Sequence, residues 1–235
     1  MAKILIADDE QSIRNAVGFY MRKEGHEVVP AADGDEALRI FEEERFDLVI
    51  LDVMMPGHGG YEVCSAIRDA NPHIPVIFLS VKDSAIDKNL GFKLGADDYV
   101  TKPFEPSELV FRVNSCLRRG SGAVLHKSGD QATGSDDGSI ELGDLCIEVA
   151  TRSVFVSGVR IDLTAKEFDI LLLMARNPNT VFARQQILDA VWGVDYYGSA
   201  GIVAVFMRKL RQKIEKDPSR PVHILTEWGV GYRIV

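Results

Sequence analysis

Cysteine is scarce in this chain: its 235 residues include only three, Cys64, Cys116 and Cys146, scattered among apolar neighbours. An odd and scattered set argues against a disulfide framework or a cysteine metal site, so we expect three core residues. Long apolar runs are also missing, since no stretch approaches a membrane span in length and no apolar signal core follows the first residues. We therefore expect a soluble, cytoplasmic protein that does not contact a membrane.

Apolar residues make up 46% of the sequence, which is enough for two ordinary domains without covalent staples. The net charge of −8 is uneven, because the acidic excess lies mainly in residues 1–119 while residues 139–235 are nearly balanced. Gly, Ser and Asp dominate residues 120–138, which show no apolar period, as is typical of flexible linkers. We predict a domain over 1–119, a flexible linker over 120–138 and a second domain over 139–235.

Short runs rich in Ile, Leu and Val alternate with stretches of helical period throughout residues 1–119. The expected strands are 4–7, 27–29, 48–51, 76–79 and 98–100. The expected helices are 11–23, 34–44, 61–69, 84–94 and 106–119. Repeated strand–helix units favour an α/β fold whose five-stranded parallel sheet is covered by helices on both faces.

Side chains that handle phosphate or its metal follow four of these strands: Asp8 and Asp9, Asp52, Ser80 and Lys102. The carboxyl ends of parallel strands share one edge of the sheet, where ligands bind. Taken singly, each has an ordinary alternative, as a helix cap, a solvated loop lysine or a hydroxyl bonded to a loop amide. Taken together, they predict phosphoryl transfer onto Asp52.

Transfer of a phosphoryl group to a carboxylate requires positive charge, because two anions must meet. Asp8 and Asp9 offer the hard oxygen ligands that Mg²⁺ prefers, and Mn²⁺ could substitute. Lys102 would pair with Asp52 or with its phosphate. Met54 precedes a Pro-Gly turn that would place its backbone carbonyl at the metal. The set predicts a magnesium-dependent phosphoacceptor site.

Four motifs resemble the receiver domain of two-component response regulators: DDE at 8–10, LDVMMPG at 51–57, LS at 79–80 and GADDYVTKPF at 95–104. The resemblance implies a flavodoxin-like, CheY-like receiver in which Asp52 takes phosphate from a cognate sensor histidine kinase. It also implies that Asp9 and Met54 bind magnesium while Asp8 acts mainly through water. Such a phosphoacceptor catalyses only its own phosphorylation and slow dephosphorylation, so we do not expect a classical enzyme.

The same resemblance implies a switch made by Ser80 and Tyr99, which alters the face of the domain beside them. Within the family, the receiver resembles the OmpR/PhoB-type subfamily, where opposite charges pair across a symmetric dimer. The pairs implied here are Lys88 with Glu108, Asp98 with Arg112 and Asp97 with Arg119. A solvated charged face is the plainer alternative. A two-fold dimer needs such self-complementarity, so we expect a homodimer when the chain is phosphorylated.

Residues 139–235 begin with short alternating segments and continue with helical periods. The segments 140–142, 145–149, 153–156 and 159–163 predict a small antiparallel sheet. Thr164 and Glu167 form a capping box before a helix, and further helices are expected at 184–191 and 202–216. A hairpin over 224–235 completes an α+β domain.

This order of elements resembles the winged helix-turn-helix domain of the same subfamily, through LTAKEF at 163–168, MRKLRQKIE at 207–215 and GVGYR at 229–233. The resemblance implies that helix 202–216 enters the major groove of double-stranded promoter DNA, that the hairpin touches the backbone or minor groove, and that RNA polymerase is a further partner. The residues implied to contact DNA are Val203, Met207, Arg208, Lys209, Arg211, Lys213, Trp228 and Arg233.

Several residues depart from the subfamily pattern. Gly201 and Ile202 open the third helix where polar or basic side chains are usual, and Ala204 and Phe206 follow where polar residues are common. Trp228 occupies a wing position that often holds arginine. It could pack within the wing, insert into DNA as an apolar wedge or anchor a protein partner.

Three functions are compatible with these patterns. The first is a transcription factor controlled by phosphorylation, and the second is an effector whose output is a protein contact. The third is a haloacid-dehalogenase-like phosphatase with Asp52 as nucleophile. That class needs a second carboxylate two residues later, where this chain has Met54. We therefore predict the first function.

Overall fold

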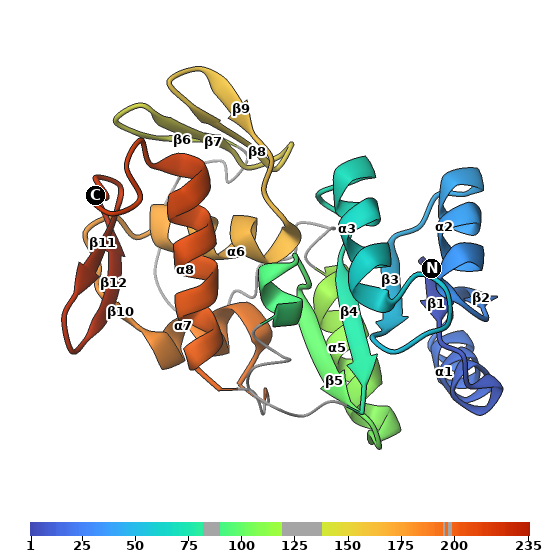
Figure 1. The fold of residues 1–235 in the computed structure, drawn as a ribbon. Coiled ribbons are helices and arrows are strands. Elements are labelled where there is room, and N and C mark those ends of the chain that lie inside the picture. The colour runs from blue at the N-terminus through green and yellow to red at the C-terminus, as the bar shows by residue number, and fades with distance from the viewer. Residues whose placement is uncertain (82–89, 119–137, 195, 197–198) are drawn as a thin grey trace. The chain divides into compact units, whose positions relative to one another are not determined.

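A computed structural model describes residues 1–81, 90–118, 138–194, 196 and 199–235 (Figure 1). The chain divides into two compact units, Met1–Gly120 and Ser121–Val235, which we describe separately. Nearly all of the predicted linker 120–138 lies outside the described residues.

Unit 1 is an α/β domain built on the predicted five-stranded parallel sheet. Its strands are β1 Lys3–Ala7, β2 Glu27–Ala31, β3 Leu48–Asp52, β4 Val76–Ser80 and β5 Asp98–Thr101. The strand order β2-β1-β3-β4-β5 changes direction at β1 and β3. Open α/β sheets bind ligands beyond the carboxyl ends of the strands at such a point.

Helices cover both faces of this sheet, as the repeated strand–helix pattern predicted. The described helices are α1 Gln11–Lys23, α2 Gly34–Glu43, α3 Gly60–Ala70 and α5 Pro106–Arg118. α1 contacts α5, and α2 contacts α3, so that each pair covers one face (Figure 1). Most of the predicted helix 84–94 falls on residues 82–89, outside the described residues, and residues 90–93 are helical.

The core of unit 1 lies between the sheet and the helices on its two faces. Every residue of β3 and β4 is buried. Ile4 and Ile6 of β1 pack with Val17 and Met21 of α1 and with Val113 of α5. Strands buried on both faces need such continuous apolar runs, which is why their pattern is not alternating.

Unit 2 combines two small antiparallel sheets with helices, as the α+β prediction required. The first sheet has the order β6-β7-β8-β9, with β6 Ser139–Leu142, β7 Leu145–Glu148, β8 Ser153–Val156 and β9 Val159–Ile161. The helices are α6 Ala165–Ala175, α7 Arg184–Trp192 and α8 Gly201–Ile214. The second sheet has the order β10-β12-β11, with β10 Phe182–Ala183, β11 Ile224–Glu227 and β12 Gly231–Ile234.

Local signals in the sequence explain where α6 begins and how the helices pack. The Thr164 amide donates to Glu167 Oε2 at 2.9 Å, and the Glu167 amide donates to Thr164 Oγ1 at 3.4 Å, which confirms the capping box. The rings of Trp192 and Phe206 pack edge to face in the core, with centroids 5.2 Å apart. The tight fit of α7 against α8 therefore depends on these two side chains.

The cysteines behave largely as expected. Cys64 and Cys116 are buried, Cys146 is half-buried, and all three are free thiols. Within the part of the chain that the structure describes, no helix combines the length and apolar character required to cross a membrane.

Candidate functional site

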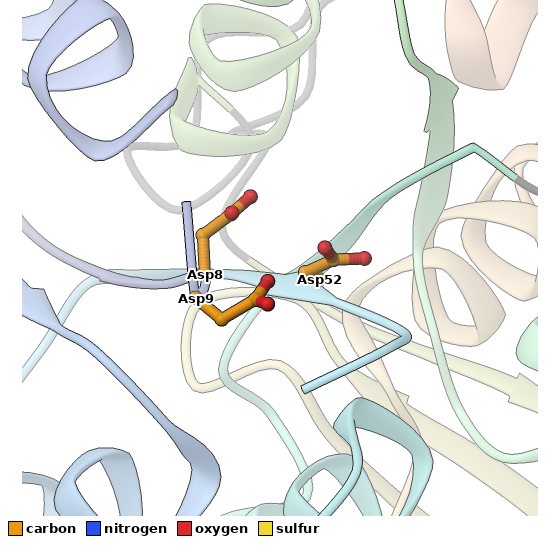
Figure 2. Close-up of side chains that lie close together, drawn as sticks. All are labelled: Asp8, Asp9 and Asp52. Atoms are coloured by element: carbon orange, nitrogen blue, oxygen red, sulfur yellow. The ribbon is translucent and has the colours of Figure 1, made fainter. Parts of the chain in front are cut away.

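Three carboxylates meet at the carboxyl ends of β1 and β3 (Figure 2). Asp8 and Asp9 follow β1, and Asp52 is the last residue of β3, which pairs with β1 in parallel. One carboxylate oxygen from each residue lies within 4.8 Å of the others. Asp8 and Asp52 are buried, whereas Asp9 is exposed. The sequence prediction that these side chains converge is confirmed.

Lys102 extends into this acidic cluster from the end of β5. Its Nζ lies 2.8 Å from Asp52 Oδ2, 2.7 Å from Asp8 Oδ2 and 3.6 Å from Glu10 Oε1. Burial lowers the pKa of Lys102, but hydrogen bonds to Asp52 and Asp8 outweigh that effect and leave the pKa raised. Burial raises the pKa of Asp8, against the opposing effect of Lys102. The ammonium group is therefore a fixed positive charge beside the Asp52 carboxylate.

The donor set fits a divalent cation that prefers oxygen ligands. Three carboxylates from two strand ends face one another, and hard cations such as Mg²⁺ are held by such groups together with water and phosphate oxygens. The amide of Met54 donates to Asp52 Oδ1 at 3.2 Å, which fixes the Met54 backbone beside the Asp52 carboxylate. The predicted metal-binding residues Asp8, Asp9, Asp52 and Met54 therefore lie close together.

The loop between Asp52 and α3 is packed tightly against α2, a feature that the sequence did not reveal. His58 Nδ1 lies 2.6 Å from Asp35 Oδ1 at the start of α2. A Cβ atom at Gly34 would lie only 1.8 Å from the carbonyl oxygen of His58, and one at Gly60 only 1.9 Å from that of Asp52. The glycines in these places are required because two backbone segments approach closely.

The predicted switch residues lie on neighbouring strands beside the acidic cluster. Ser80 is the last residue of β4 and is fully buried, and it pairs in register with Thr101 of β5. Tyr99 is also buried, with its ring 6.2 Å from that of Phe78. The structure thus brings Ser80 to the carboxyl edge and holds the Tyr99 ring inside the domain.

Two acidic residues predicted to lie on a pairing face are buried and bound within the chain. Asp97 is fully buried, and its Oδ2 accepts from Arg68 at 2.6 Å. Asp98 is buried as well, and Arg112 contacts both Asp98 Oδ1 at 2.9 Å and Glu108 Oε1 at 2.6 Å. A guanidinium from α3 thus neutralises Asp97 inside the domain, and its implied pairing with Arg119 across a dimer remains a prediction.

Lys88 and Arg119, the remaining residues of the implied dimer face, lie outside the described residues. The intermolecular pairs remain a prediction. To pair across a dimer, Asp98 and Arg112 would have to give up the contact that they already make with each other within one chain.

Helix α8 buries two residues that the sequence placed on DNA. Val203 and Met207 are fully packed in the core, together with Leu210 and Ile214. Their spacing of three or four residues forms the apolar stripe of the helix, which faces the other helices. Ile202 and Phe206 are buried too, so these departures from the subfamily pattern are core residues rather than altered DNA contacts.

Two lysines of α8 are held by a buried carboxylate. Glu167 is fully buried, with Oε1 3.1 Å from Lys209 Nζ and Oε2 2.7 Å from Lys213 Nζ. Burial alone would raise the pKa of Glu167, but the two ammonium groups outweigh it and leave the pKa lowered. The structure therefore places Lys209 and Lys213 in a contact between α6 and α8, and their contact with DNA remains a prediction.

Arg211 is bound to the hairpin rather than presented to solvent. Its Nε and Nη2 donate to the Ile224 carbonyl at 3.0 and 2.7 Å, and Nη2 also donates to Thr226 Oγ1 at 2.8 Å. Arg208 and Gln212 of α8 are exposed. Of the predicted DNA contacts on α8, Arg208 is the exposed cation.

The hairpin turn exposes an indole. Trp228 is 91% exposed, so the alternative that it packs within the wing is wrong. Arg233 is half-buried and lies 2.5 Å from Glu227 Oε1, so its charge is balanced by a neighbour on the other strand. The two wing residues predicted to contact DNA thus differ: one is a paired cation, the other a projecting aromatic ring.

Comparison with known proteins defines the class to which this fold and site belong. The family model of the response regulator receiver domain matches residues 4–114, and that of the transcriptional regulatory protein C-terminal domain matches residues 158–234. The chain belongs to the OmpR/PhoB-type family of two-component response regulators.

Full-length relatives share this arrangement. The sensory transduction protein RegX3 of Mycolicibacterium smegmatis is 44% identical over 234 residues, which cover 100% of this chain and 99% of that protein. RegX3 of Mycobacterium tuberculosis is 42% identical over the same coverage. The crystal structure of Thermotoga maritima DrrB, an OmpR/PhoB homologue, is 36% identical with a TM-score of 0.52, covering 100% of this chain and 99% of that one.

This membership settles the broad function. The chain is a response regulator of a two-component system, with a receiver domain and a DNA-binding domain that regulates transcription. It implies a sensor kinase and DNA as partners, and it removes the phosphatase alternative, because the family is a group of regulators rather than classical enzymes.

Proposed function

We propose that Asp52 accepts a phosphoryl group from a sensor histidine kinase in a magnesium-dependent reaction, and that this promotes dimerisation and sequence-specific binding to promoter DNA. The observation that carries the proposal is the position of the Asp52 carboxylate. One oxygen accepts from the Met54 amide and the other from Lys102, directly beside Asp8 and Asp9.

In this reaction an Asp52 oxygen forms a bond to phosphorus while the bond from phosphorus to the kinase imidazole nitrogen breaks, and the nitrogen keeps the electron pair. Asp8, Asp9 and Asp52 would hold Mg²⁺, or Mn²⁺ in its place, and the positive charge of the ion would relieve repulsion between the anions. Lys102 remains in place through transfer and stabilises the negative charge on the acyl phosphate.

The phosphorylated receiver then acts through its neighbours on the sheet. Ser80 and Tyr99 lie on β4 and β5 beside the acceptor, and they couple it to the face that carries Asp98, Glu108 and Arg112. A homodimer formed on that face would present two DNA-binding units, as two-fold operators require. We place this exchange in the cytoplasm, with RNA polymerase as the partner that reads the bound promoter.

The phosphoacceptor is tested by incubating the purified chain with acetyl phosphate and magnesium and measuring its intact mass. The wild type should gain one phosphoryl group, and the gain should require a divalent cation. Asp52→Ala should abolish it, whereas Asp69→Asn, which changes an exposed carboxylate on α3, should label normally. Retained labelling of Asp52→Ala would show that the acceptor is elsewhere.

The output is tested by enriching genomic DNA fragments with the purified chain before and after acetyl phosphate treatment. Stronger enrichment of specific fragments after treatment, together with a faster-sedimenting species, would support a phosphorylation-driven dimer on DNA. Arg208→Ala should weaken binding by roughly 1–3 kcal/mol if its exposed guanidinium reads a base. Labelled protein that enriches no fragment would move the output to a protein contact.

A further inference from the structure

Arg14 binds the backbone of two residues in the acidic cluster. It belongs to α1, and its Nη1 donates to the carbonyl oxygen of Asp8 at 2.6 Å and to that of Asp9 at 2.9 Å. Long helical side chains point back toward the N-terminus of their helix, which brings the Arg14 guanidinium to the segment that joins β1 to α1. Hydrogen bonds from a charged donor are stronger than neutral ones, so they hold this segment firmly.

The three carboxylates of the cluster are held in different ways. Those of Asp8 and Asp52 each have two partners, a backbone amide and the ammonium group of Lys102. Asp9 is exposed, and no hydrogen bond or ion pair to its carboxylate is found among the described residues. Figure 2 shows that this carboxylate is turned toward Asp52. Its position therefore depends on the backbone of Asp9, which Arg14 binds.

Electrostatics alone does not account for a cation at this position. Arg14 is the fourth residue of α1, near the end where the helix dipole carries partial positive charge and disfavours cations. Arg22 and Lys23, by contrast, lie in the last turn, where the dipole favours them. Arg14 would also repel a divalent cation held by the cluster. The hydrogen bonds to the two carbonyl oxygens are the contacts that favour it.

We propose that Arg14 is a positioning residue of the metal site, whose hydrogen bonds hold the Asp9 carboxylate where it can share a divalent cation with Asp8 and Asp52. This inference rests on the magnesium-dependent function proposed above and adds a residue to it. Groups that orient metal ligands without touching the metal set its affinity, and losing one typically weakens binding by roughly 10- to 100-fold. A merely structural role in the segment between β1 and α1 would lower stability and leave that affinity unchanged.

Replacing Arg14 by methionine separates positioning from charge, because the two effects have opposite signs. Methionine keeps an apolar stem and loses the charge and both hydrogen bonds. If only the charge mattered, removing a cation from the neighbourhood of the ion would tighten metal binding. If the Asp9 carboxylate loses its fixed position, metal binding weakens. Working in 0.15 M KCl, where the Debye length is about 8 Å, reduces the effect of the charge.

The first experiment titrates the full-length chain with Mn²⁺ and follows the free ion by its electron paramagnetic resonance signal. Binding that persists in Asp52→Ala lies outside the cluster and is subtracted. Arg14→Met should raise the Kd for Mn²⁺ about ten-fold. Arg14→Lys keeps the charge and a donor on a shorter side chain, so its Kd should rise by less. Thermal unfolding followed by circular dichroism shows that each variant is folded at the temperature of the titration.

Arg22→Met is the matched control, because it makes the same exchange on the same helix about 12 Å further along. Arg22 also donates to a backbone carbonyl, that of Val28 at 3.4 Å. The control should bind Mn²⁺ as the wild type does.

The second experiment measures the rate of acetyl phosphate labelling over a series of Mg²⁺ concentrations. Arg14→Met should need about ten-fold more Mg²⁺ than the wild type for half-maximal labelling. At saturating Mg²⁺ its rate should approach that of the wild type, because Asp52 and Lys102 are unchanged. The shift in Mg²⁺ requirement at a similar maximal rate is the signature of a positioning residue.

The outcomes separate this inference from the proposed function. If Arg14→Met binds Mn²⁺ as tightly as the wild type or more tightly, the inference is overturned, whatever its melting temperature, and the function stands as long as the wild type is labelled at Asp52. If Arg14→Met does not fold, Arg14→Lys decides: a raised Kd supports the inference, and an unchanged or lower Kd overturns it. If the wild type binds no Mn²⁺ at the cluster and is labelled without a divalent cation, the magnesium-dependent function and the inference fail together.

Discussion

Replacing Glu167 by glutamine removes one buried charge from unit 2 and changes little else. The carboxylate is fully buried and lies 3.1 Å from Lys209 and 2.7 Å from Lys213. A glutamine has the same shape, and its amide oxygen can still accept from the Thr164 amide, so the capping box is kept. The variant therefore isolates the charge that joins α6 to α8.

The size of the effect follows from the burial of each partner. Removing one member of a fully buried ion pair destabilises a protein by roughly 3–5 kcal/mol. The side chains of Lys209 and Lys213 keep 15% and 32% of their surface exposed, so both can regain some hydration. We therefore expect Glu167→Gln to lower the free energy of unfolding of unit 2 by about 2–3 kcal/mol.

The chain offers a selective probe for this measurement, because both of its tryptophans, Trp192 and Trp228, lie in unit 2. Urea unfolding of the full-length protein followed by tryptophan emission reports that unit alone. Arg160→Gln is the matched control, since its partner Asp162 is 3.9 Å away and both side chains are more than half exposed. The control should stay within about 0.5 kcal/mol of the wild type.

The pH dependence gives an independent check with a definite sign. The folded pKa of Glu167 lies below its usual value of 4.5, so its stabilisation is present above that value and is lost as pH falls through the folded pKa. The difference between wild type and Glu167→Gln should therefore be full at pH 7 and shrink in acid below pH 4.5. Equal midpoints for Glu167→Gln and Arg160→Gln at pH 7 would refute the reasoning.

Three further variants test unit 1. Gly34→Ala would place a Cβ atom 1.8 Å from the His58 carbonyl oxygen, so thermal unfolding of the receiver followed by circular dichroism should show a loss of about 1–3 kcal/mol. Arg68→Ala would leave the buried Asp97 without its guanidinium, and the same assay should show a loss of about 3–5 kcal/mol. Lys102→Ala removes the cation from the acidic cluster, and the rate of acetyl phosphate labelling should fall on the order of 100-fold. A melting curve like that of the wild type for Gly34→Ala or Arg68→Ala would contradict the role given to that residue. Labelling of Lys102→Ala at the wild-type rate would contradict the role of Lys102.

The strands and the acidic cluster were predictable because their signals are local and redundant. The run 48–51 is apolar throughout, and the strand that it predicts is Leu48–Asp52 in the structure. The acidic, hydroxyl and amine side chains each follow such a run, and parallel topology alone brings them to one edge. By contrast, β10 contains only two residues, which is too short to show the alternating pattern of a strand in the sequence. Its pairing with β12 could therefore not be predicted.

The contacts of α8 were harder to predict because basic residues that are adjacent in sequence point in different directions around a helix. Val203, Met207, Leu210 and Ile214 recur at intervals of four, three and four residues, a period that already marked Val203 and Met207 as core positions. Nothing local shows that Lys209 and Lys213 would reach Glu167, which lies more than 40 residues earlier in the chain. Long-range ion pairs of this kind appear only after the helices are packed.

The number of basic residues on α8 is therefore a poor measure of the charge that this helix offers to DNA. Lys209, Lys213 and Arg211 hold α8 to α6 and to the hairpin, and their charges are balanced or hydrogen-bonded inside unit 2. Fewer phosphates can then be neutralised than the sequence suggests, and the salt dependence of binding should be correspondingly shallow. Under the proposed DNA-binding output, more of the affinity should therefore come from uncharged contacts than the number of basic residues on α8 suggests.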